Sequence, residues 1–498
     1  MEAQAPQPTP ALWPARAARI LLAAVLILAA ADCLRILHDG FTHVLRPYPT
    51  CDTELHIVDG IRSLARGELV YPEVGGLPFL IRVYNAMTYV PAGLVGRLFP
   101  DDFEALLIAG RVLPYLSALL FLFLVARYTH HRFGSWLLTA FAPALMLIMH
   151  SSTLTDFFRN RPEMPALALT FAGWYAFELR VRAWPVLSAL LFVAAFAFKQ
   201  SVLSAPVAVL LLLAHAREGR FLVIFVITSV LAGSTLTLGA YLFLGSGYFS
   251  HTVALLAVNP VDPLRASSFF YPILVQRHWG AFFPASLLAV SWLLFRGRAK
   301  PLWTYLAVCL LWTTYSHGKT GADLNYHGEL SILMALAVVV ATGTMMQMRS
   351  RWAPLPVAGV ALFLVWGIAS HGYGWNRVCL NRIRPTPHCS VSSPPFGDVR
   401  AAAEAYRSRS DQALILQSEI ALRTGRPVGV GAGFITLLFR LGVLDLEPLF
   451  AEVRSRRPAI IVLPRRPIGY QVRVAREALA AGYVFVRRDD HVLELERR

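Results

Sequence analysis

Long apolar runs separated by short arginine-bearing segments constrain this chain more than any other feature. Of its 498 residues, 56% are hydrophobic and only 15% are charged, and the mean hydropathy is +0.53. A soluble domain carries about 25% charged residues, so this composition excludes an ordinary soluble fold. Because about 20 apolar residues cross a bilayer as one helix, the runs predict a polytopic α-helical membrane protein.

The basic residues between the runs predict how the chain is threaded through the membrane. Cytoplasmic loops of membrane proteins are enriched in Arg and Lys. Arg16 and Arg19 precede the first run, and each later short segment that we place inside carries at least two Arg or Lys. The resulting topology has about 11 transmembrane helices, a cytoplasmic N-terminus and an external C-terminus. We interpret 83–99, which holds Asn85 and Pro91, as a partly sunken helix in a long first outer loop.

The composition changes after the last predicted span. Strand-like runs then alternate with helical patterns, the strands at 413–418, 459–464 and 483–488 and the helices at 446–457 and 471–481. Alternation of this kind predicts a small α/β domain. We therefore divide the chain into a transmembrane domain, 1–372, which we expect to hold the functional site, and an extracytoplasmic α/β domain, 373–498.

The first long polar interruption, 49–72, carries two carboxylates near its start, Asp52 and Glu54. From 54 to 66 the sequence has two helical faces, the apolar one with Leu55, Val58, Ile61, Leu64 and Ala65 and the polar one with His56, Asp59, Arg62, Ser63 and Arg66. A short amphipathic helix of this kind lies in a membrane interface rather than crossing the bilayer. The alternative is a solvated loop in which Asp52 only caps the helix.

Unusual polar groups gather at the face that we place outside. The set is Asp52, Glu54, Asp156, Arg159, Arg161, Glu163, Lys199, His317, Lys319, Asp323 and His327. It includes two of the three lysines of the chain. A transporter is expected to place such groups near the membrane midplane. Charges gathered at one interface suit chemistry on a lipid-linked substrate, while ordinary loop polarity accounts for several of them.

The cysteine and glycine patterns exclude some other sites. Cys379 and Cys389 lie ten residues apart in the predicted outer linker, where a disulfide forms if the compartment is oxidising. Cys309 lies within an apolar run, so we expect a buried thiol there. The glycine-rich run at 429–433 lacks the frame of a nucleotide-binding fingerprint. No metal-type cysteine or histidine spacing is present, and we expect no nucleic-acid partner.

Four motifs, in this order, resemble those of the GT-C superfamily of integral-membrane glycosyltransferases. They are Asp52 with Gly67 fifteen residues later and ELVYP after it, Arg111 at the head of the second span, RPEMP at 161–165, and GKTGADLNYHGEL at 318–330. The similar family stretches have Asp-Glu and Arg-Pro-Asp, where this chain has Thr53 and Glu163. The resemblance is closer to the RgtA/B/C/D-like group than to the related aminoarabinose transferases and protein O-mannosyltransferases. It covers 15–345 and extends loosely to the tail.

The resemblance implies transfer of a sugar from a polyprenyl-phosphate donor to a hydroxyl of a glycan, lipid or protein, outside the bacterial inner membrane. A carboxylate then accepts the hydroxyl proton, and the resemblance favours Asp52, with Glu54 competing and Glu163 as a third catalytic candidate. The implied phosphate ligands are Arg111, Arg161, Lys199 and Lys319. The other implied substrate ligands are Tyr71, Asp156, Arg159, Asn325, Tyr326 and His327. No cofactor is certain, and the acids are able to hold Mg²⁺ or Mn²⁺.

Two other classes of function fit the same residues. A transporter or flippase of lipid-linked sugars would use the outer cations to hold phosphate without catalysis. A nonenzymatic assembly partner would tolerate free replacement of the carboxylates.

Overall fold

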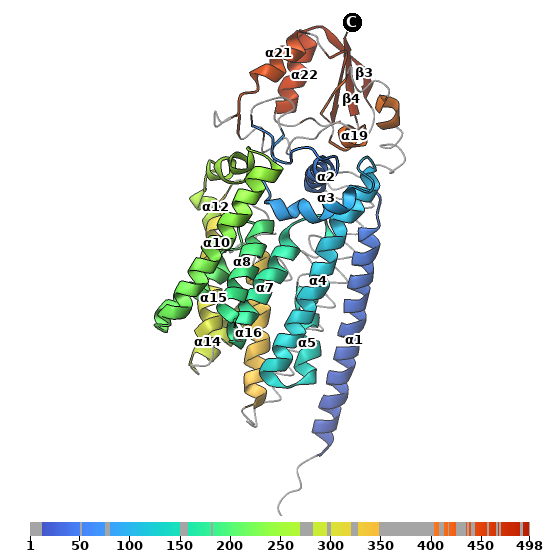
Figure 1. Cartoon of the computed structure of the whole chain (residues 1–498). Coiled ribbons are helices and arrows are strands. Elements are labelled where there is room, and N and C mark those ends of the chain that lie inside the picture. The colour runs from blue at the N-terminus through green and yellow to red at the C-terminus, as the bar shows by residue number, and fades with distance from the viewer. Residues whose placement is uncertain are drawn as a thin grey trace, which may run out of the picture.

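The computed structural model describes 12–347, apart from 50–51, 75–79, 150–157, 181–182, 269–281, 296–299 and 320–326, and much of 403–497. Within these ranges the chain is mostly helical, with a small sheet at one end (Figure 1). The predicted eleventh span and the linker with Cys379 and Cys389 lie outside the described residues.

Apolar helices coincide with the predicted spans that fall within the described residues. They are α1 (Leu12–Val44), α4 (Phe103–Phe133), α5 (Trp136–Met149), α7 (Glu163–Leu179), α8 (Trp184–Phe198), α9 (Ser204–His215), α10 (Gly219–Leu244), α14 (Phe282–Phe295), α15 (Lys300–His317) and α16 (Gly328–Gln347). Among them α4, α10 and α16 are long and apolar enough to cross a membrane, by length and composition. The 20 residues of α16 extend about 30 Å, the thickness of the hydrocarbon core. The prediction of a helical protein with several apolar helices is confirmed.

Burial separates the centre of the bundle from its edge. Every residue of α16 from Gly328 to Thr344 is buried, whereas α10 exposes Leu231, Leu238 and Phe243. Water disfavours such large apolar side chains, and lipid accepts them. Helix α16 is therefore a central helix of the bundle, and α10 has the surface of a lipid-facing helix. Cys309 of α15 is fully buried, as the sequence predicts.

Short elements between α1 and α4 cover the end of the bundle that carries the sheet (Figure 1). They are α2 (Asp52–Ala65), the 3₁₀ helix η1 (Ala86–Thr88) and α3 (Val90–Gly96). The seven residues of α3 extend only about 10 Å, too short to cross a membrane. The segment predicted to be partly sunken is thus a broken helix packed against α2 and α4.

Helix α2 differs from the predicted interfacial helix in what covers its polar face. Its apolar face is buried as expected. However, Asp59, Arg62 and Ser63 are also buried, with exposed fractions of 1%, 5% and 7%. An interfacial helix would present these groups to head groups and water, but Arg82 and the backbone of Leu422 contact them here. The periodicity of the sequence reveals two faces but does not distinguish water from a polar protein surface.

The segment that follows α10 contacts the segment between α2 and η1. It contains the π-helix η2 (Ser250–Ala254), α11 (Leu255–Ala257) and α12 (Pro263–Ser267). The backbone N of Tyr71 donates to the carbonyl of Leu244 at 2.8 Å, and that of Gly247 donates to the carbonyl of Tyr71 at 3.2 Å. Gly245 has a φ of 132°, and a Cβ there would collide with the backbone of Tyr71. Only glycine allows this close approach of the two loops.

The C-terminal region forms a mixed four-stranded sheet. Its strands are β1 (Ala413–Ile415), β2 (Ile460–Pro464), β3 (Tyr483–Arg488) and β4 (Val492–Arg497), in the order β1-β2-β4-β3. Strands β1 and β2 are parallel, with Leu414 opposite Ile461, and the other two pairs are antiparallel. The helices are α19 (Ser418–Arg423), α21 (Glu447–Arg454) and α22 (Tyr470–Ala480).

The sequence predicts β1 to β3, α21 and α22, but it misses β4 and α19. Residue 418 was expected to end a strand, whereas α19 begins there. Strand β4 alternates apolar and charged residues, and its Leu493 and Leu495 are buried. Six residues of this composition at a chain end are easily taken for a solvated tail. The α/β character of the region is confirmed.

Candidate functional site

Glu54 and Arg111 form a fully buried ion pair where α2 begins. Nε and Nη2 of Arg111 donate to the two carboxylate oxygens of Glu54, each at 2.8 Å. Both side chains are 0% exposed. The remaining guanidinium N–H groups donate to the carbonyl oxygens of His43, Arg46 and Tyr48. Since a guanidinium has five donors, Arg111 has no donor left over.

The segment before α7 closes on this pair. The backbone N of Asn160 donates to Oε1 of Glu54 at 2.9 Å. Gly110 precedes Arg111 on α4, and a Cβ there would collide with the side chain of Asn160. The Gly110–Arg111 sequence therefore lets this segment lie directly on α4. Asn160 was not among the predicted site residues, because an asparagine in a loop carries no signal of its own.

The same segment meets the first turn of α2. Nη2 of Arg161 lies 3.4 Å from Oγ1 of Thr53. Asp52 is the first residue of α2, and the positive end of a helix dipole favours a carboxylate there as the anion. The side chain of Asp52 and the whole of Asp156 lie outside what the structure describes. Arg159 is partly exposed, and its carbonyl accepts the backbone N–H of Arg161 at 2.7 Å.

A second charged group lies between α7, α8, α15 and α16. The ammonium of Lys199 is 3.0 Å from Oε1 of Glu163, and both side chains are buried. Glu329 accepts from the hydroxyl of Tyr305 and from that of Ser204, each at 2.6 Å. A cavity of about 30 Å³ is lined by Glu163, Leu167, Lys199, Ser201, Val202, Trp312, Thr313, Ser316 and Glu329. That volume accommodates a water molecule.

Tyr71 and His327 are turned into the protein. Tyr71 is fully buried and its hydroxyl donates to the carbonyl of Tyr84 at 2.7 Å. Burial raises the pKa of Tyr71 well above its usual range, so the hydroxyl remains a donor. The buried ring of His327 lies 5.1 Å from that of His317.

Lys319 contacts Tyr315 and Val261. Its ammonium lies over the ring of Tyr315, 5.6 Å from the ring centre. Its backbone pairs with that of Val261, which lies between α11 and α12. Asn325 and Tyr326 lie outside the described ranges.

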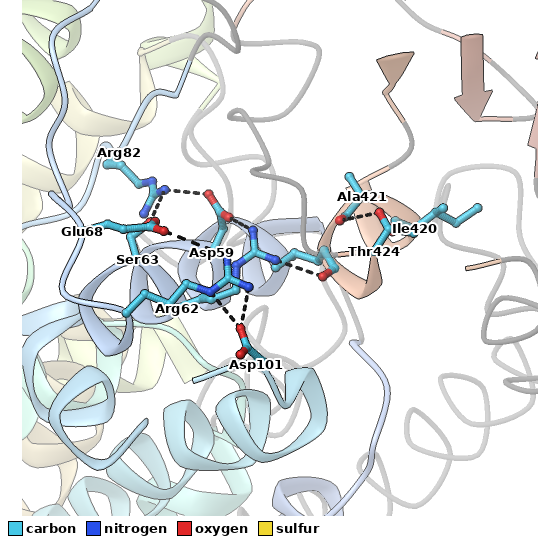
Figure 2. A network of polar contacts seen from close by, with 11 residues as sticks. Asp59, Arg62, Ser63, Glu68, Arg82, Asp101, Ile420, Ala421 and Thr424 are labelled. Atoms are coloured by element: carbon cyan, nitrogen blue, oxygen red, sulfur yellow. Dashed lines mark hydrogen bonds and ion pairs between the residues drawn. The ribbon is translucent and has the colours of Figure 1, made fainter. Parts of the chain in front are cut away.

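Arg82 is a residue that the sequence analysis missed. Its Nη2 donates to Oδ2 of Asp59 at 2.6 Å and lies 3.3 Å from Oγ of Ser63. Arg62 donates to the other oxygen of the same carboxylate at 2.7 Å, so two guanidinium groups share Asp59 (Figure 2). Nε and Nη1 of Arg82 are buried without a hydrogen-bond partner among the described residues. A lone arginine within an apolar stretch, as in FLIRVY, was the available signal.

His251 contacts the backbone of Arg82. Its Nδ1 is 3.1 Å from the backbone N of Arg82, and its Nε2 is 2.6 Å from the carbonyl of Pro72. A backbone N–H only donates, so Nδ1 accepts and Nε2 carries the proton that is donated to Pro72. Burial lowers the pKa of His251, the carbonyl of Pro72 opposes that change, and the charge of Arg82 adds to it.

The described carboxylates do not fit a metal ion. Glu54 is neutralised by Arg111, and Glu163 is paired with Lys199. In the described part of the chain, no three His, Cys, Asp or Glu side chains converge as metal ligands would. The charges at this end of the bundle are arranged as ion pairs, with cations in excess around Asp59.

Comparison with known proteins gives a fold. No protein-family model and no curated protein matches the sequence. The structure of ArnT from Cupriavidus metallidurans bound to undecaprenyl phosphate matches with a TM-score of 0.57 at 12% identity, over 94% of this chain and 97% of that one. The apo structure of that ArnT gives 0.58 at 13% identity with the same coverage. The oligosaccharyltransferase of Archaeoglobus fulgidus, in complex with Zn and sulfate, matches with a TM-score of 0.47 at 12% identity. That match covers 89% of this chain and 68% of the other.

ArnT is an aminoarabinose transferase of the GT-C superfamily. Its alignment with this chain covers the helical bundle and the C-terminal sheet together, since it includes 94% of the residues. The resemblance is therefore confirmed at the level of the fold: this chain has the fold of ArnT.

Proposed function

We propose that this chain is a glycosyltransferase that moves a sugar from a polyprenyl-phosphate-linked donor to an acceptor hydroxyl. The observation that carries the proposal is the position of the segment before α7. Through Asn160 and Arg161 it contacts the first turn of α2, and Glu163, the first residue of α7, contacts Lys199. A carboxylate-bearing helix start and several cations thus meet around one segment. The ArnT-like fold supports this function, because one of its structures was solved with undecaprenyl phosphate.

In this reaction the acceptor oxygen attacks the anomeric carbon while the bond from that carbon to the phosphate oxygen breaks. Polyprenyl phosphate leaves as a stable anion, so no strong general acid is required. The acceptor proton passes to a base, and we assign that role to Asp52. Both oxygens of Glu54 accept hydrogen bonds from Arg111, which leaves Glu54 better suited to fix the start of α2. Base catalysis of this kind typically contributes about 10² to 10⁴ in rate.

Cationic side chains suit the leaving phosphate. Arg161, Lys199 and Lys319 remain candidates, and we add Arg82 because two of its buried donors have no partner among the described residues. The guanidinium of Arg111 is saturated by protein acceptors, so we assign it to positioning rather than to phosphate. Sugar and acceptor contacts fall to the residues nearby, with Glu163, Arg159, His327, Asp156, Asn325 and Tyr326 as candidates.

We place this site and the C-terminal α/β domain on the outer face of the bacterial inner membrane, with eleven spans and a domain boundary near residue 372. The basic residues at the opposite end of the bundle support this orientation. Reporter fusions after Arg132, Arg220 and Lys300 should therefore be cytoplasmic, and a fusion after Arg498 should be external. A cytoplasmic C-terminus would contradict both the span count and the outer location of the site.

The reaction is tested with purified full-length protein in lipid nanodiscs. Radiolabelled polyprenyl-phosphate sugars are added with glycan, lipid and protein acceptors, and both the labelled acceptor and the released polyprenyl phosphate are quantified. We expect equal amounts of the two products. Movement of intact donor between vesicle leaflets without cleavage would instead identify a flippase. Absence of transfer with every donor would refute the proposed function.

A further inference from the structure

The C-terminal unit, defined here as β1 to β4 with α19, α21 and α22, contacts the helix that bears Asp52. Figure 2 shows α19 beside the middle of α2. Ala421 and Leu422 of α19 are buried in one apolar cluster with Val58 and Ile61 of α2. Nη1 of Arg62 donates to the carbonyl of Leu422 at 2.9 Å. The contact thus combines apolar burial with a directed hydrogen bond.

Arg62 joins two groups that belong to different parts of the chain. It is 5% exposed, and Nη1 and Nη2 reach Leu422 and Asp59 respectively. The carbonyl of Leu422 lies in the last turn of α19, where helix carbonyls lack helical donors and carry partial negative charge. A guanidinium makes both bonds at once because its donors form a rigid fork, which an ammonium does not reproduce.

The next residue of α19, Arg423, makes a second anchor. Its guanidinium lies 3.3 Å from Oε1 of Glu104 and 3.2 Å from the carbonyl of Pro47, and it stacks 4.4 Å from the ring centre of Phe103. The Arg423 side chain is 6% exposed. Pro47 belongs to the link between α1 and α2, five residues before Asp52. The end of α19 therefore contacts α2, the segment leading into α2 and the start of α4.

We propose that the C-terminal unit positions α2, and through it Asp52, with Arg62 and Arg423 as positioning residues. The proposal rests on the proposed function, because the position of Asp52 affects rate only if Asp52 accepts the proton. Arg111 holds Glu54 at the start of α2, and α19 holds its middle. Because α2 is one continuous helix, releasing its middle shifts or tilts its first turn. A displacement of about 1 Å at reacting groups is enough to lower a rate about hundredfold.

The test compares single substitutions in the full-length protein in nanodiscs. Arg62→Gln removes the fork, Arg62→Lys keeps the charge, and Arg423→Gln removes the second anchor. Arg454→Gln is the matched control, because the ion pairs of Arg454 with described residues are to Glu447 and Glu477, on the surface of the same unit. The measurements are kcat per folded molecule, donor KM, the thermal unfolding midpoint and hydrogen exchange of the α2 amides.

We expect Arg62→Gln to lower kcat at least about tenfold while donor KM changes less than about twofold. Exchange of the α2 amides should rise in Arg62→Gln and, to a smaller extent, in Arg423→Gln, with Arg62→Lys between wild type and Arg62→Gln. Arg454→Gln should match wild type in every measurement. If Arg62→Gln does not fold, Arg423→Gln and Arg62→Lys carry the same comparison.

Two results would overturn the proposal. One is a lower unfolding midpoint with unchanged kcat per folded molecule, because that pattern describes a purely structural contact. The other is unchanged exchange in α2 for both Arg62→Gln and Arg423→Gln. Failure of the proposed function is distinguishable: wild type would then transfer no sugar, while faster α2 exchange in Arg62→Gln but not in Arg454→Gln would still support the coupling between α19 and α2.

Discussion

The start and the middle of α2 hold their buried charges in different ways. At its start one carboxylate, Glu54, faces one guanidinium, and every donor of Arg111 has a protein acceptor. Further along, Asp59 serves both Arg62 and Arg82, and two donors of Arg82 have no partner among the described residues. The first arrangement is closed, whereas the second has donors without a described acceptor, which is why we propose Arg82 as a phosphate ligand.

Breaking the closed end should have the largest effect on stability. Arg111→Met leaves Glu54 buried without its cation, which is expected to lower the free energy of unfolding by about 3 to 5 kcal/mol. The double variant Arg111→Met with Glu54→Leu should recover part of that loss, because it removes the unpaired charge as well. Both are measured by thermal unfolding in detergent. Equal stability of the single variant and wild type would show that the pair is not closed.

Asp52→Asn should have the next largest effect, and on turnover rather than on folding. The amide still caps the helix but cannot take up a proton, so kcat should fall at least about hundredfold while donor binding persists. The glycosyl transfer assay measures this fall. Glu54→Gln is the comparison, scored per folded molecule. Near-normal turnover in Asp52→Asn with collapse in Glu54→Gln would move the base to the closed end of the helix.

The group around Asp59, where cations outnumber carboxylates, is tested with Arg82→Gln. Loss of a charge-assisted hydrogen bond costs about 1.5 to 3 kcal/mol, so donor KM should rise about ten- to hundredfold. The matched comparison is Lys319→Ala, since Lys319 lies over Tyr315 at the end of α15. A larger rise in donor KM for Lys319→Ala would place the phosphate away from α2. Unchanged kcat and donor KM in Arg82→Gln would mean that its unused donors serve no ligand.

Much of the fold was predictable from the sequence because helices and strands depend on neighbouring residues. The length of the apolar runs and their arginine ends located α4 and α10, and β-branched runs located β2. The site was predictable only as a set of charged residues. Glu54 pairs with Arg111 across 57 positions, and Glu163 pairs with Lys199 across 36. No local pattern encodes such distant pairings, so the ion pairs of Arg111 and Lys199 could not be predicted from the sequence.

The smallest expected effect is a pH dependence from His251, which lies next to Arg82. His251 accepts from the backbone of Arg82 through Nδ1, and protonation there would set two donors against each other. Its pKa is lowered mainly by burial, so the unfolded chain binds this proton more readily than the folded one. The stabilisation is therefore fully present above the ordinary histidine pKa of about 6.5 and is lost as the pH falls below it. Between pH 7.5 and pH 5.5 the wild-type protein should lose more stability than His251→Gln, whose amide does not titrate. The losses in the free energy of unfolding should differ by about 1 kcal/mol or less, and thermal unfolding at each pH measures them. Parallel pH profiles for the two proteins would show that the protonation of His251 is not linked to folding.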